Sequence, residues 1–164
     1  MGDEGSGYYI GRRALAAVVM AYDQRGAATS LTGPVCQHFH VAMPPELPPV
    51  IYNEPIKVMH EIAQLSKLVV QHAEAGDPVA CAILTDAATE LARAVNAVIK
   101  KLGMQQQHFR VAYVGGVFNA GELVLGPLRQ QIQQYAPGAE LAAPLFAPVE
   151  GAVKLARQLG CGTR

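Results

Sequence analysis

The segment GDEGSG at residues 2–7 combines two adjacent carboxylates, Asp3 and Glu4, with three glycines. Glycine lets a backbone approach a ligand closely, and a helix that starts here would direct free N–H groups at an oxygen-rich or anionic ligand. The carboxylates would repel a bare phosphate, but they suit sugar hydroxyls or a Mg²⁺ ion that offsets phosphate charge. A solvated turn in which Ser6 caps the following helix is the alternative interpretation.

A second candidate site follows the apolar run at residues 111–114, which ends in Gly115-Gly116. This run predicts a strand that is buried on both faces, as in a parallel sheet. Open α/β sheets bind ligands just beyond the carboxyl ends of their strands. A nucleotide could therefore lie against the two glycines, with Asn119 as a polar contact. A tight strand-to-helix turn is the alternative interpretation.

The segment CQHFH supplies three side chains that can bind a metal, namely Cys36, His38 and His40. No fourth ligand is evident, whereas structural zinc usually takes four, so an ordinary loop is expected and no metal site is predicted. The three cysteines of the chain, which include Cys81 and Cys161, are far apart and form no CxxC pair. This usage favours a reduced, cytoplasmic protein with free thiols.

Helical periodicity predicts helices over residues 8–22, 55–76 and 78–102. Asp77 is placed to cap the third of these helices, and Gly103 is placed to end it. The third helix is expected to bury one apolar face, which consists of Val79, Ile83, Ala87, Leu91, Val95, Val98 and Leu102.

Residues 26–55 contain six prolines, which break long elements. This stretch is predicted to be a Pro-rich connector that runs extended over the surface, with a short helix around residues 35–42.

After the 111–114 strand, the sequence predicts a helix over residues 121–135, a weak strand over 139–144 and a final helix over 148–160. Gly126-Pro127 could delay the start of the first of these helices. Alternating helices and strands indicate an α/β unit with crossover connections. Two strands are too few for a complete sheet. We therefore expect residues 1–164 to form one domain whose remaining strands lie on another segment or another chain.

Composition excludes several classes of partner. Of the 164 residues 51% are hydrophobic, the formal net charge is zero, and aromatic residues make up 6% with no Trp. Nucleic acids and anionic membranes are therefore not expected as partners. No apolar run reaches the roughly 18 residues that span a bilayer, and no signal peptide is expected.

Four segments, in this order, resemble the C-terminal half of the N-acetylglucosamine kinase and BadF/BadG/BcrA/BcrD-type ATPase family. These segments are GDEGSGYYIGRRAL, IAQLSKLVVQHAEAGDPVACAI, YVGGVF and AAPLFAPVEGAVKLA. The family belongs to the superfamily of sugar kinases, actin and 70-kDa heat-shock chaperones. The resemblance implies a helix-rich α/β fold, namely a partial ribonuclease-H-like lobe of an actin-like ATPase with few parallel strands.

The resemblance also implies roles for eight residues. Substrate binding falls to Asp3 and Glu4, and nucleotide binding falls to Gly5, Ser6, Ala63, Gly115, Gly116 and Asn119. In this interpretation Asp3 contacts the sugar, Ala63 borders the nucleotide, and the glycine pair packs on the adenosine. No catalytic residue and no metal ligand are expected in the chain.

Two features of the family are absent from the sequence, namely a DGGGT-like phosphate loop and an NDA-type segment with the catalytic Asp. The chain is therefore expected to be the second lobe of an ATP- and Mg²⁺-dependent amino-sugar kinase. It should be inactive without a first lobe, which is supplied in cis or in trans, and it should self-associate into a homo-oligomer. The alternatives are a lobe of a BadF-type ATPase that activates a dehydratase, and a non-enzymatic nucleotide-binding module. The cysteines do not resemble the iron–sulfur ligands of the activator branch, which favours the kinase.

Overall fold

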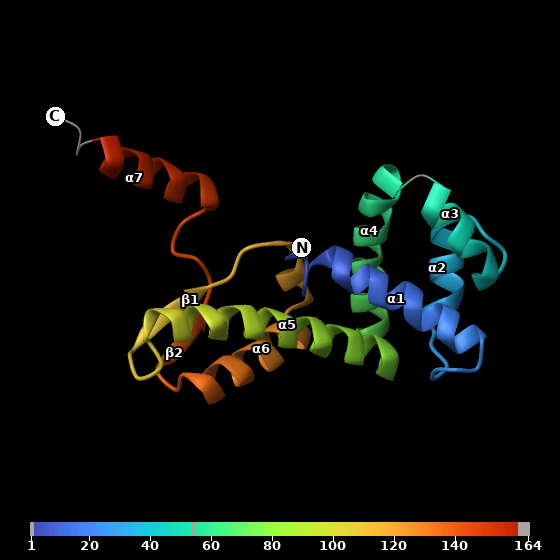
Figure 1. Cartoon of the computed structure of the whole chain (residues 1–164), viewed down its shortest axis with the longest axis horizontal. Helices are drawn as coiled ribbons and strands as arrows, with labels where there is room; N and C mark the ends of the chain where they lie inside the picture. Colours follow the sequence, from blue (N-terminus) through green and yellow to red (C-terminus); the bar gives the residue numbers. More distant parts are fainter. Residues whose placement is uncertain (1, 54, 161–164) are drawn as a thin grey trace.

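The computed structural model describes residues 2–53 and 55–160, and it is rich in helix with one small sheet (Figure 1). The helices are α1 (Gly7–Tyr22), α2 (Thr32–His38), α3 (Leu47–Asn53), α4 (Pro55–Glu74), α5 (Pro78–Leu102), α6 (Glu122–Tyr135) and α7 (Pro148–Gly160). The 3₁₀ helices are η1 (Pro44–Glu46) and η2 (Gly116–Ala120), and the strands are β1 (Phe109–Ala112) and β2 (Ala139–Ala142). The predicted helix-rich α/β class is confirmed.

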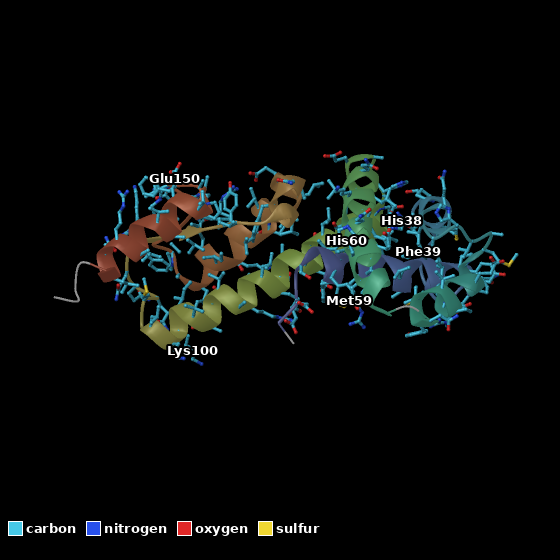
Figure 2. The ribbon with its side chains drawn as sticks, turned by 90° about the horizontal axis from the view of Figure 1, so that it is seen from above. His38, Phe39, Met59, His60, Lys100 and Glu150 are labelled. Atoms are coloured by element: carbon cyan, nitrogen blue, oxygen red, sulfur yellow. The ribbon has the colours of Figure 1, made fainter. Side chains whose placement is uncertain are left out.

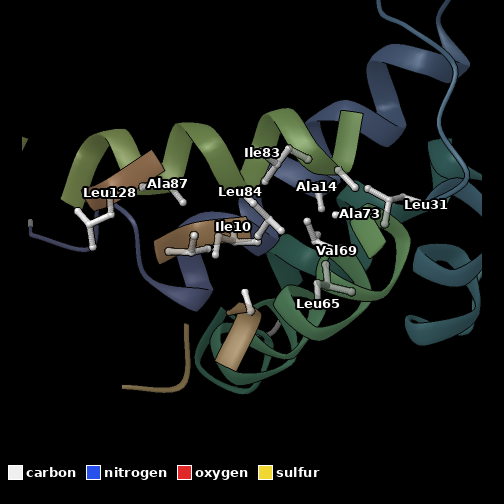
Figure 3. Packing of buried hydrophobic residues seen from close by; sticks show 14 of the residues in the cluster. Ile10, Ala14, Leu31, Leu65, Val69, Ala73, Ile83, Leu84, Ala87 and Leu128 are labelled. Carbon is white, nitrogen blue, oxygen red and sulfur yellow. The ribbon is translucent and has the colours of Figure 1, made fainter. Parts of the chain in front are cut away.

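The core forms where α1, α4 and α5 pack together, with α6 against α5 (Figure 3). Ile10 and Ala14 lie one helical turn apart on α1, and both are buried, as the periodicity predicted. Leu65 and Val69 do the same on α4, and Leu84 of α5 belongs to the same buried cluster. The helical spacing of Ile10 and Ala14, and of Leu65 and Val69, can be recognised in the sequence. These buried pairs join two segments that are far apart in the chain.

Both ends of α5 are capped as predicted. The Asp77 carboxylate accepts hydrogen bonds from the backbone N–H groups of Val79 and Ala80, at 2.8 and 2.9 Å. Gly103 adopts the left-handed conformation that ends the helix, with φ 66° and ψ 32°. Because its first and last turns are satisfied, α5 extends over 25 residues.

The predicted extended connector over residues 26–55 is wrong, because most of this stretch is helical. All six prolines lie in the first turns of helices, namely α2, η1, α3 and α4. A missing N–H donor costs nothing there because no intrahelical acceptor is available. Leu47 is buried in the core, and Pro44 is buried as well. The proposed short helix does exist, but it occupies Thr32–His38.

The sheet consists of β1 and β2, which pair in parallel with Phe109 opposite Ala139. β1 overlaps the predicted strand at residues 111–114, but its first and last residues each lie two positions earlier. It is not buried on both faces, since half-buried and exposed residues alternate along it. The described part of the chain covers only one face of this strand, so the expectation of a fully buried strand is wrong here. The helix after η2 starts at Glu122, so Pro127 lies inside α6 and does not delay it.

The apolar surfaces of two helices lie open. Val98 and Leu102, which were expected on the buried face of α5, are 56% and 61% exposed. The predicted final helix is present as α7, but none of its residues is buried, and Figure 1 shows it standing apart from α5 and α6. In Figure 2, Lys100 of α5 and Glu150 of α7 lie toward the same end of the molecule.

Candidate functional site at the start of helix α1

The GDEGSG turn fits tightly against α5 at one glycine. Gly5 has φ 80°, a conformation that side chains rarely adopt. A Cβ atom at this position would lie 2.5 Å from Leu91 Cγ and 2.8 Å from the backbone oxygen of Ala87. Only glycine fits this place, and the contact fixes where the two carboxylates before it can lie.

Ser6 and Ala63, which the resemblance placed at a nucleotide site, lie close together. The Ser6 side chain caps α1 by accepting a hydrogen bond from the backbone N–H of Tyr9 at 3.1 Å. At the next residue, a Cβ on Gly7 would lie 3.4 Å from the backbone oxygen of Ala63. The Ser66 hydroxyl donates to that same oxygen at 2.7 Å. The N-terminal turn of α1 therefore rests on α4 at Ala63.

Asp3 and Glu4 are exposed and line a cleft of about 410 Å³ beside α1. The other residues that line this cleft are Tyr8, Tyr9, Arg12, Arg13 and Ala16. The cleft thus combines carboxylates, which accept hydrogen bonds from hydroxyl groups, with guanidinium groups, which donate to anions.

A hydrogen-bonded cluster supports the floor of this cleft. The Tyr9 hydroxyl donates to Asp86 of α5 at 2.6 Å, and Arg13 Nε lies 3.2 Å from the same carboxylate oxygen. The hydrogen bond to Asp86 raises the pKa of Tyr9, and burial raises it further. Sequence reasoning recognised Asp86 only as a residue within a helix. The four-residue spacing of Tyr9 and Arg13 shows that they share a face of α1, but it does not reveal their partner.

Gly115, Gly116 and Asn119 lie in the segment that follows β1, where Gly115 directly precedes η2 and the other two residues lie within it. Gly115 has φ 131°, and a Cβ on either glycine would meet no atom within 4 Å, so the backbone is open to a ligand on this side. All three residues are exposed. None of them lines the cleft at Asp3 and Glu4. The structure thus packs the GDEGSG turn against α5 at Gly5 and against Ala63 of α4 at Gly7. The glycine pair does not line the cleft at this turn.

The described residues contain no group of three or more His, Cys, Asp or Glu side chains that could hold a metal ion. Cys36 is buried in the core, and burial raises the pKa of its thiol. His38 Nε2 lies 3.1 Å from the carboxylate of Glu61. Cys36 and Cys81 are free thiols, whereas Cys161 lies outside the described residues.

Comparison with known proteins identifies the family. The model of the BadF/BadG/BcrA/BcrD ATPase family matches residues 1–156. The chain therefore belongs to this family, and the resemblance found in the sequence is confirmed.

Two curated relatives are amino-sugar kinases. The chain is 35% identical over 157 residues to the N-acetyl-D-glucosamine kinase of Dictyostelium discoideum, and this match covers 95% of the chain and 49% of the kinase. It is 32% identical over 157 residues to the N-acetylmuramic acid/N-acetylglucosamine kinase of Clostridium acetobutylicum, and this match covers 96% of the chain and 51% of that kinase. The chain thus spans about half the length of these relatives.

No helix among the described residues is long and apolar enough to cross a membrane.

Proposed function

We propose that this chain is the C-terminal lobe of an ATP-dependent amino-sugar kinase of the N-acetylglucosamine type. One observation carries the proposal: the GDEGSG turn presents Asp3 and Glu4 at a cleft while its last residues rest on α4 at Ala63. In this proposal, the carboxylate that binds the sugar and the wall that borders the nucleotide would lie on adjoining surfaces. The similarity to two amino-sugar kinases over nearly the whole chain supports the same conclusion.

In this proposal, each part of the site has a defined task. Asp3 accepts hydrogen bonds from sugar hydroxyls, and Glu4, Gly5 and Ser6 line the cleft near the phosphates. Mg²⁺, when bound, would offset the charge of the phosphates. The open backbone at Gly115-Gly116 would pack on adenosine, with Asn119 beside it. Phosphoryl transfer depends mainly on positioning and electrostatics, and the proton-accepting carboxylate would come from the first lobe.

The partner in the proposal is therefore an N-terminal lobe, in cis or in trans, and the chain alone would not turn over ATP. The exposed apolar residues of α5 and α7 support an additional association into homo-oligomers. The free thiols of Cys36 and Cys81 are compatible with a cytoplasmic location.

The test is ATP hydrolysis and phosphoryl transfer by this chain mixed with the N-terminal half of a complete relative, with and without N-acetylglucosamine. We expect sugar-dependent ATP consumption by the mixture and none by this chain alone. Asp3→Asn should weaken sugar binding by roughly 10- to 100-fold, because a hydrogen bond to a charged group contributes about 1.5–3 kcal/mol. Asp23→Asn, at an exposed carboxylate after α1 that pairs with Arg25, is the matched control.

Other outcomes would contradict the proposal. If the mixture consumes ATP equally with and without sugar, the chain is a lobe of an activator-type ATPase. If the mixture binds ATP analogues without turnover, it is a non-enzymatic nucleotide-binding module. Turnover by this chain alone would refute the division of labour between two lobes.

A further inference from the structure

Asp86 of α5 holds two residues of α1 that lie one helical turn apart. Its carboxylate oxygen Oδ2 accepts a hydrogen bond from the Tyr9 hydroxyl at 2.6 Å and lies 3.2 Å from Nε of Arg13. Both partners line the cleft at the GDEGSG turn, whereas Asp86 itself does not. Any effect of Asp86 on a ligand in this cleft must therefore pass through the residues that it holds.

A chain of hydrogen bonds continues from Tyr9 to the backbone of Asp3. The backbone N–H of Tyr9 donates to the hydroxyl oxygen of Ser6 at 3.1 Å. The backbone N–H of Ser6 in turn donates to the backbone oxygen of Asp3 at 3.0 Å. Tyr9 thus joins α5, through its side chain, to the GDEGSG turn, through its backbone. A displacement of Tyr9 is therefore expected to displace Asp3 as well.

The turn touches the same stretch of α5 at a second place. A Cβ on Gly5 would lie 2.8 Å from the backbone oxygen of Ala87 and 2.5 Å from Leu91 Cγ. This contact limits how closely the turn can approach α5, whereas the hydrogen bond between Asp86 and Tyr9 opposes movement away from it. The two contacts lie before and after the N-cap of α1, so together they fix the turn to α5.

The bond from Tyr9 is expected to matter more than the ion pair with Arg13. The Arg13 side chain is 55% exposed and that of Asp86 is 34% exposed, so solvent screens much of their attraction. The Tyr9 hydroxyl is partly buried and donates to a charged acceptor, which makes a stronger hydrogen bond than a neutral pair does. Removal of this one hydroxyl is therefore the sharpest test of what Asp86 does.

We propose that Asp86 is a positioning residue of the sugar site. Through Tyr9 and Ser6 it fixes the backbone of Asp3, and so it sets the place from which the Asp3 carboxylate accepts hydrogen bonds from the sugar. This inference rests on the proposed function, which places the sugar at Asp3. Asp86 itself does not contact the substrate.

The first test measures the turn without any ligand, by amide hydrogen exchange of the whole chain followed by NMR. Tyr9→Phe and Asp86→Ala should each speed exchange at the Ser6 and Tyr9 amides by roughly 3- to 10-fold, as expected for the loss of one hydrogen bond. Asp86→Asn should restore most of the protection, because its amide oxygen still accepts from the Tyr9 hydroxyl.

The second test measures the sugar site, in this chain mixed with the N-terminal half of a complete relative. Tyr9→Phe and Asp86→Ala should raise the KM for N-acetylglucosamine by roughly 3- to 10-fold, and Asp86→Asn should raise it less. Glu122→Gln is the matched control, because it breaks an exposed ion pair with Arg129 of α6 outside the cleft. It should change neither the KM nor the exchange at the turn.

The KM separates positioning from support of the fold, because partial unfolding lowers kcat through the active fraction and leaves KM unchanged. If Tyr9→Phe and Asp86→Ala lower kcat alone, the inference about Asp86 is wrong. It is also wrong if exchange at the turn does not rise, and in both cases the proposed function stands. If the wild-type mixture shows no sugar-dependent turnover, the proposed function fails and the positioning role of Asp86 fails with it.

Discussion

Gly11 of α1 packs directly against the backbone of α4, and replacing it with alanine should destabilise the protein. Gly11 is buried, and a Cβ there would overlap the backbone oxygen of Ile62. The same Cβ would lie 2.8 Å from the carbonyl carbon of Ile62 and 3.0 Å from its Cγ2. Ordinary Cβ contacts lie at 3.4–4 Å. Since the obstacle is backbone, the two helices have to move apart for Gly11→Ala to be accommodated.

The size of the effect follows from two opposing contributions. Overpacking a core costs about 1–3 kcal/mol, and the upper end applies because the obstacle cannot rotate away. Alanine in place of glycine inside a helix returns about 1 kcal/mol. The expected net loss for Gly11→Ala is therefore about 2 kcal/mol, which corresponds to about 4–8 °C in Tm for a chain of this size.

Urea unfolding followed by far-ultraviolet circular dichroism measures this loss. Gly151→Ala is the matched control, because Gly151 also lies in a helix and a Cβ there meets nothing within 4 Å. Gly151→Ala should leave stability unchanged or raise it by up to about 1 kcal/mol. If Gly11→Ala proves as stable as wild type, the close approach of α1 to Ile62 does not exist in solution.

Two further predictions concern Asp77, which is 8% exposed and also accepts hydrogen bonds from Thr29 and Ser30. Asp77→Ala should lower the free energy of unfolding by about 2–4 kcal/mol, since it removes a helix cap and several charge-assisted hydrogen bonds; urea unfolding at pH 7 measures this loss, and little or no loss would contradict the cap. Burial alone would raise the pKa of Asp77, but the hydrogen bonds from Ser30, Ala80 and Thr29 outweigh it and hold the pKa well below its ordinary value of 3.8. A carboxyl group with a depressed folded pKa stabilises the protein above its unfolded pKa, and this contribution is lost as pH falls toward the folded pKa. The stability difference between wild type and Asp77→Ala should therefore be constant from pH 7 to about pH 5 and should shrink below about pH 4; a difference that stays constant down to pH 3 would refute the linkage.

Local signals in the sequence predicted the helices that have clear caps. Asp77 and Gly103 mark the two ends of α5, and the structure uses both as caps. The prolines between residues 44 and 49 misled the prediction, because proline breaks a helix interior but is accepted in a first turn. Whether a proline breaks a helix or begins one depends on where the preceding segment ends. Here Leu47, which begins α3, is buried in the core.

The candidate site was predicted only in its local parts. The GDEGSG turn and the N-cap at Ser6 follow from neighbouring residues, and the resemblance pointed to Ala63 on α4. The pairing of Asp86 with Tyr9 and Arg13 joins two helices whose relative rotation is set by packing, so no spacing in the sequence reveals it. The exposure of α7 and of the end of α5 likewise depends on which surfaces the described chain leaves uncovered.

The carboxylate of Asp77 ties together two points of the chain that are 47 residues apart. It closes a long loop much as a disulfide does in a secreted domain, but the closure is a set of hydrogen bonds and is reversible with protons. Protonation of Asp77 at low pH would weaken its hydrogen bonds to both segments, because one carboxylate oxygen accepts from Ser30 and the other accepts from the first turn of α5. Helix α2 begins directly after Thr29 and Ser30, so the same protonation would weaken the hydrogen bonds that fix the start of α2 to α5.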